Sequence, residues 1–90
     1  MIRYRIDVIS ELNKRGFNSL TAKNTGLFGQ STMQKFKSGD TSISLENLNR
    51  LCAILDMQPQ DIIEYVPDKE HDKIYMAYLE KLKQLKIDNH

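Results

Sequence analysis

Apolar positions in this chain recur every three or four residues, the spacing of one face of an α-helix. The clearest case follows Ser44 and predicts a helix over about 45–55, with Ser44 as its N-cap and Glu46 near the positive end of its dipole. The apolar members of this run are Leu45, Leu48, Leu51, Cys52 and Leu55. We interpret them as core positions.

The same periodicity predicts four further helices in the first 68 residues. Their ranges are about 6–14, a short one from Asn18 or Ser19 to about Thr25, 30–38, and a short one opened by Pro59. The inward face of the second would use Leu20 and Ala22. No strand-like alternation appears, so the expected fold class is all-α.

Residues 25–40, TGLFGQSTMQKFKSGD, have the pattern of a helix-turn-helix. Gly26 ends one helix, Gly39 ends the next, and a polar start at Gln30 lies between them. Met33 and Phe36 are three apart and predict an inward face. The opposite face presents Gln30, Ser31, Gln34, Lys35 and Lys37, and such a polar face suits the major groove of DNA.

A last amphipathic helix is predicted over about 71–87. Its stripe consists of Ile74, Tyr75, Tyr78, Leu79, Leu82 and Leu85. Three interpretations remain open at this point: the helix folds back onto the domain, it forms a dimer contact, or it is a partly disordered tail that becomes ordered on binding.

Composition narrows the class of protein. Ninety residues with 40% hydrophobic content suit one small domain. The single cysteine, Cys52, and the two histidines argue against a disulfide framework, a metal site or a zinc-dependent enzyme. The sequence also contains no catalytic or phosphate-binding motif, so we expect neither enzymatic activity nor a cofactor. No secretion signal or membrane-spanning run is apparent, so the expected location is cytoplasmic.

The net charge of +1 conceals an uneven distribution. Residues 1–40 carry seven Lys or Arg against three Asp or Glu, a local charge of +4, whereas residues 41–70 carry a local charge of −4 and residues 71–90 about +1. The basic part contains the predicted helix-turn-helix, and local cations can displace counterions from a phosphate backbone. Ordinary charge scatter is the alternative explanation.

Residues 25–40, taken with ISLENLNRLCAILDMQPQDIIEYVPD at 43–68, resemble the Cro/phage-repressor type of helix-turn-helix, the XRE family of bacterial and phage transcription regulators. The resemblance implies a compact five-helix lambda-repressor-like DNA-binding domain over residues 1–68, followed by an additional amphipathic helix and tail over 69–90. Two departures occur. The turn 26–29 is one residue longer than the commonest family turn, and Asp61 follows Gln60 where many relatives have Gly.

The resemblance also implies a set of DNA-contacting residues on the third helix and around it. Base edges would be read by Gln30, Ser31, Gln34 and Lys35, and phosphates would be contacted by Asn18, Lys23, Thr32, Lys37 and the backbone amides near Ser44. The expected partner is double-stranded DNA, a palindromic operator bound by a homodimer, with repression more expected than activation. Ile74, Tyr75, Tyr78 and Leu82 would serve packing or dimerisation.

In an alternative functional interpretation, the protein has the same fold but does not bind DNA. In it the acidic region 41–70 and the C-terminal helix bind a protein partner, as in an antitoxin or an anti-repressor.

Overall fold

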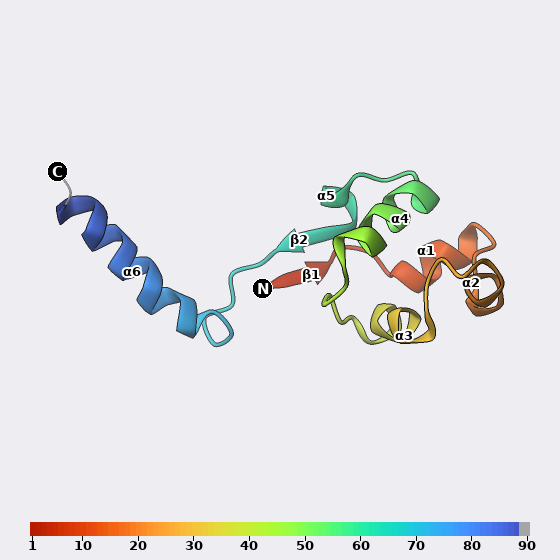
Figure 1. Ribbon diagram of the computed structural model, residues 1–90, viewed down its shortest axis with the longest axis horizontal. Helices are drawn as coiled ribbons and strands as arrows, with labels where there is room; N and C mark the ends of the chain where they lie inside the picture. Colours follow the sequence, from red (N-terminus) through yellow and green to blue (C-terminus); the bar gives the residue numbers. More distant parts are fainter. Residues whose placement is uncertain (89–90) are drawn as a thin grey trace.

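A computed structural model of the protein describes residues 1–88 and contains a small folded domain from which one long helix projects (Figure 1). The elements in chain order are β1 (Ile2–Tyr4), α1 (Val8–Lys14), α2 (Ser19–Thr25), α3 (Gln30–Ser38), α4 (Leu45–Leu55), α5 (Pro59–Ile62), β2 (Ile63–Tyr65) and α6 (Lys73–Asp88). Helices therefore dominate the described residues, as the periodicity predicts.

The two strands correct the all-α expectation. β1 and β2 pair antiparallel and join the start of the domain to its end. The register places Ile2 opposite Tyr65, Arg3 opposite Glu64 and Tyr4 opposite Ile63. Across the sheet, Arg3 Nε donates to Glu64 Oε1 at 3.0 Å. Strands of three residues are too short to produce a recognisable alternation in sequence, and for this reason the sheet was not predicted.

Local side-chain chemistry determines where the helices begin and end. Asp7 accepts a hydrogen bond from the Ser10 amide at 3.0 Å and starts α1 two residues later than the apolar pattern predicts. Ser44 caps α4 as expected, because its hydroxyl accepts from the Asn47 amide at 3.0 Å. Asp56 then ends α4 in the left-handed region, with φ of 54°.

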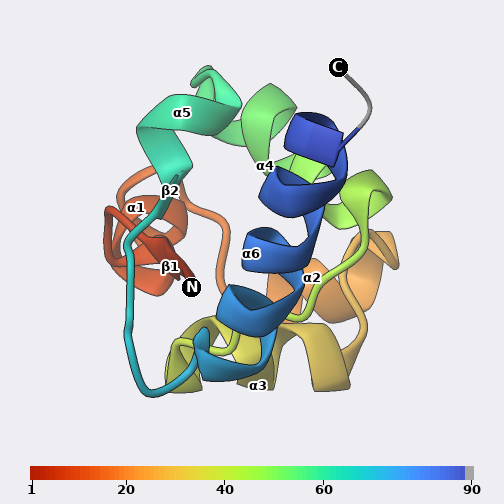
Figure 2. The same ribbon diagram turned by 90° about the vertical axis from the view of Figure 1, so that its left-hand side faces the viewer.

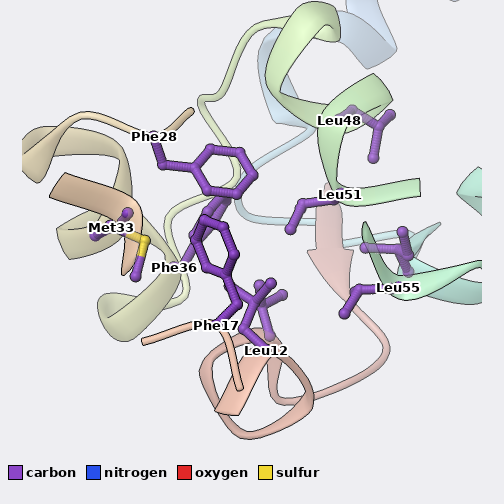
Figure 3. Close-up of a cluster of buried hydrophobic side chains, with 11 residues drawn as sticks. Leu12, Phe17, Phe28, Met33, Phe36, Leu48, Leu51 and Leu55 are labelled. Carbon is purple, nitrogen blue, oxygen red and sulfur yellow. The ribbon is translucent and has the colours of Figure 1, made fainter. Parts of the chain in front are cut away.

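The core lies between α1, the α2–α3 unit and α4 (Figure 3). Its buried members are Val8, Leu12, Phe17, Ala22, Phe28, Met33, Phe36, Leu48, Leu51, Leu55 and Ile62. Phe28 contacts both Phe17 and Phe36 edge to face, with ring centroids 5.7 and 5.2 Å apart. Such pairs add to the free energy gained from area burial alone. The aromatic cluster therefore ties the loop after α1, the turn before α3 and α3 itself together.

Two leucines predicted to face inward do not. Leu20 is 64% exposed and Leu45 is 82% exposed. Both lie in the first turn of a helix, and the buried residues of these helices begin further along, at Ala22 and Leu48. Periodicity indicates which face of a helix is apolar, but it does not indicate how far the core extends along that helix.

α6 does not fold back onto the domain. It begins at Lys73, two residues after the predicted start, and extends away from β2 as a separate rod (Figure 1). Each residue of its apolar stripe, from Ile74 to Leu85, is between 50% and 70% exposed. The interpretation of this helix as an extra core element is therefore wrong for the described structure.

Candidate nucleic-acid interface

The candidate interface is the outer face of α3. Two views at right angles place α3 on one side of the domain and α5 on the opposite side (Figures 1 and 2). Met33 and Phe36 are 7% and 4% exposed and fix the inner face of α3 in the core. The side chains left exposed along the helix are Gln30, Ser31, Gln34, Lys37 and Ser38. The predicted polar face, apart from Lys35, is thus directed to solvent.

The turn between α2 and α3 is held from inside and from α4. Gly26 ends α2 with φ of 68°, a conformation that favours glycine. Phe28 at the centre of the turn is 2% exposed. From α4, Arg50 Nη1 donates to the Leu27 carbonyl at 2.7 Å. The additional residue in this turn is therefore accommodated by a buried aromatic anchor and a charged hydrogen bond.

A second link from α4 fixes α3 directly. Asn47 Nδ2 donates to the Thr32 hydroxyl at 3.4 Å, and Thr32 is only partly exposed. This contact directs the Thr32 side chain towards α4. Of the residues that hold α3, sequence analysis did not identify Phe28, Asn47 or Arg50. Of these three, only Phe28 could have been found from the sequence, because an aromatic residue between two glycines of a short turn indicates a buried anchor.

Lys35 has a different position from the exposed glutamines. Its ammonium group donates to the Ser42 carbonyl at 2.7 Å, and the side chain is half-buried along the loop between α3 and α4. A base contact by Lys35 would require this hydrogen bond to be exchanged for one to DNA. In the free protein, Lys35 positions the loop.

The same loop is organised by Asp40. Its carboxylate accepts from the Ser42 hydroxyl at 2.6 Å and from the Ser42 amide at 2.8 Å, and these bonds lower the pKa of Asp40. Tyr4 donates to the Asp40 carbonyl at 2.8 Å. Burial, followed by the charge of Asp40, raises the pKa of Tyr4 to about 12. The loop that leads to the start of α4 is therefore fixed on both sides.

The residues expected to contact phosphates lie around this face. Lys23 and Lys37 are exposed and line a groove between α2 and α3, together with Leu20, Gln30 and Gln34. Asn18 caps α2 by accepting from the Thr21 amide at 3.0 Å. Ser44 caps α4 in the same way. Each cap takes up the third amide of its helix, and the two amides before it lie at exposed helix N-termini. The arrangement combines cations and helix N-termini around a polar helix.

Other chemistry has little support within residues 1–88. No group of three or more His, Cys, Asp or Glu in this range could hold a metal ion. Cys52 is partly buried beside the core and forms no disulfide. No described helix is long and apolar enough to cross a membrane.

The packed α2 and α3, with their connecting turn and exposed polar face, define a helix-turn-helix protein. Comparison with family models gives a match to the Cro/C1-type HTH DNA-binding domain over residues 5–68, and the chain belongs to this family. Its members are DNA-binding transcription regulators, and this is the class of the present protein. No curated protein and no solved structure matches the chain.

Proposed function

We propose that the protein is a repressor that places α3 in the major groove of its operator and binds as a homodimer. The observation that carries the proposal is the division of α3 into a buried apolar face and an exposed polar face. Gln34 lies at the centre of the exposed face, with Gln30 and Ser31 one turn earlier. Glutamine can form a bidentate pair with adenine, and serine can bond several base edges.

Phosphate contacts would hold the domain in register. Four candidate phosphate-contacting sites lie near α3: Lys23, Lys37 and the helix N-termini at Asn18 and Ser44. These sites would contact the DNA backbone on both sides of the major groove. Lys35 would join the base contacts only after it releases the Ser42 carbonyl. A dimer is proposed because one α3 reads only a few base pairs, which is too little for tight specificity. Occupancy of the operator would then exclude polymerase.

Selection of bound sequences from random duplexes tests the operator. We expect a sequence with two-fold symmetry. The affinity for that sequence should fall linearly on a double-logarithmic plot against salt, because each phosphate contact releases counterions. No measurable DNA association even at low salt would contradict the proposal and favour a protein-interaction module.

Substitution of single glutamines tests the recognition helix. Gln34→Ala should weaken binding to the selected operator by about 1–3 kcal/mol and relax the preference at one base pair. Gln60→Ala is the matched control, since Gln60 is an equally exposed helical glutamine on α5, on the opposite side of the domain (Figure 2). Equal affinity of both variants for the operator would show that α3 does not read the bases through Gln34.

A further inference from the structure

The apolar stripe of α6 is continuous and uncovered. Successive helical residues are rotated by about 100°, so its six members fall within an arc of roughly 140°. Those members are Ile74, Tyr75, Tyr78, Leu79, Leu82 and Leu85, each at least half exposed. Met76 is similarly exposed but lies outside the arc. A stripe of this width is typical of a helix that packs against another apolar surface.

The start of α6 is fixed in a way that keeps the stripe away from its own domain. Asp72, which precedes the helix, is 8% exposed. Its carboxylate accepts from the Tyr65 hydroxyl and from the Asp68 amide, each at 3.0 Å, and it lies 3.1 Å from His71 Nδ1. We call these four residues the Asp72 joint. The joint connects β2 to α6 through specific bonds, so the direction of the helix is defined by the structure.

We propose that α6 pairs antiparallel with α6 of a second copy of this chain. The available area is sufficient. The stripe side chains are between 50% and 70% exposed, and a fully buried aromatic side chain removes about 150–250 Å² from solvent, so complete coverage would bury on the order of 100 Å² each. Two stripes of six would then bury at most roughly 1,200 Å² in total, which is the lower end of the range for stable interfaces.

The charges around the stripe favour the antiparallel direction. Residues 68–73, at the start of the helix, carry three carboxylates and two lysines, a local charge of −1. Residues 80–88, at its end, carry three lysines and two carboxylates, a local charge of +1. A parallel pair would place the two positive ends level with one another, whereas an antiparallel pair directs the positive end of each helix towards the negative start of the other.

Sedimentation velocity on the full chain without DNA tests the pairing, from about 1 µM to 1 mM. The wild type should reach twice its 10.5 kDa mass. Leu82→Glu should raise the dimer dissociation constant at least tenfold, because it places a carboxylate within the stripe. Met76→Glu is the matched control and should leave the constant unchanged, as it adds the same charge to the same helix outside the stripe. A wild type that stays monomeric, or a dimer that Leu82→Glu does not weaken, overturns the proposal.

Disulfide trapping tests the direction in a Cys52→Ser background. If the two antiparallel stripes are aligned centre to centre, near residue 80, Tyr75 of one copy lies level with Leu85 of the other. A mixture of Tyr75→Cys and Leu85→Cys chains should therefore cross-link on oxidation, and neither variant alone should do so. Cross-linking of Tyr75→Cys with itself would indicate a parallel pair. A dimer that Leu82→Glu disrupts but that gives no cross-link would indicate that α6 docks elsewhere on the partner. Either result overturns the antiparallel pair.

The pairing concerns the homodimer proposed above, but its test uses no DNA. A dimer that binds no DNA duplex would disprove the regulatory function but not the α6 pair. A monomer that binds its operator tightly would disprove the α6 pair alone.

Discussion

α4 and α6 carry similar leucine-rich stripes, but only one of the two is covered. Leu48, Leu51 and Leu55 of α4 are at most 8% exposed, while every stripe residue of α6 is at least 50% exposed. The difference comes from the chain around each helix. α4 follows a loop held against β1 and α3, and α6 follows the Asp72 joint that directs it outwards. Equal periodicity therefore leads to a core in one case and to a free surface in the other.

The largest expected effect compares one leucine from each helix. Leu51→Ala removes a side chain with no exposure and should lower the free energy of unfolding by about 2–5 kcal/mol. Leu82→Ala should change it by less than about 0.5 kcal/mol in dilute monomer. Urea unfolding followed by circular dichroism measures both. Similar losses for the two variants would mean that α6 is covered after all.

A smaller effect concerns the contacts by which α4 supports the recognition unit. Arg50→Met should cost about 1–2 kcal/mol of stability, because the partly buried Leu27 carbonyl loses its donor. The operator affinity should fall as well, since the turn before α3 loosens. Glu46→Gln is the control: it removes the exposed ion pair with Arg50 at 3.5 Å and one charge at the start of α4, and it should cost less than about 1 kcal/mol. If Arg50→Met behaves like Glu46→Gln, the turn is held by Phe28 alone.

A local effect is expected at the base of α6. Asp72→Asn should speed hydrogen exchange at the Asp68 amide and in the first turn of α6. The Asp72 carboxylate accepts hydrogen bonds from the Asp68 amide and the Tyr65 hydroxyl, and both bonds weaken when its charge is removed. Exchange in α4 should not change. Glu70→Gln, an exposed neighbour, should leave α6 exchange as in the wild type. Unchanged protection in Asp72→Asn would show that the joint does not fix the helix.

The smallest effect is a resistance to acid. Hydrogen bonds from the Asp68 amide, and then from His71, hold the pKa of Asp72 well below its ordinary value of 3.8. A carboxyl group with a lowered folded-state pKa stabilises the fold above its ordinary pKa, and this contribution disappears as the pH falls through the lower folded-state value. The joint should therefore persist from neutral pH to below pH 4. NMR of the Asp68 amide measures this, and loss of the bond near pH 5 would contradict it.

Features of the fold that depend on residues close together in the sequence could be predicted, and features that depend on residues far apart could not. Caps and stops, such as Ser44 and Gly39, act within one turn, so the bounds of α3 and α4 could be predicted from the sequence. Met33 and Phe36 were recognised by spacing alone, and their burial confirms the inward face of α3. The strands could not be predicted, because their pairing joins residues about sixty positions apart.

The candidate site likewise has features that the local sequence predicts and features that depend on distant parts of the chain. The exposure of Gln30, Ser31 and Gln34 follows from helical geometry and was predictable. The bond from Lys35 to the Ser42 carbonyl depends on how the following loop returns, and neither residue type indicates it. The roles of Asn47 and Arg50 depend on the packing of α4 against α3. These residues carry no motif of their own.

The projection of α6 sets a length scale for the operator. The helix has 16 residues, roughly 24 Å of rod, and the described structure measures 56 Å along its longest axis. In the proposed dimer, two such rods joined at their midpoints would hold the two domains apart instead of in contact. We therefore expect operator half-sites at one fixed separation, and inserting half a turn of DNA between them should place the second half-site on the wrong side of the duplex.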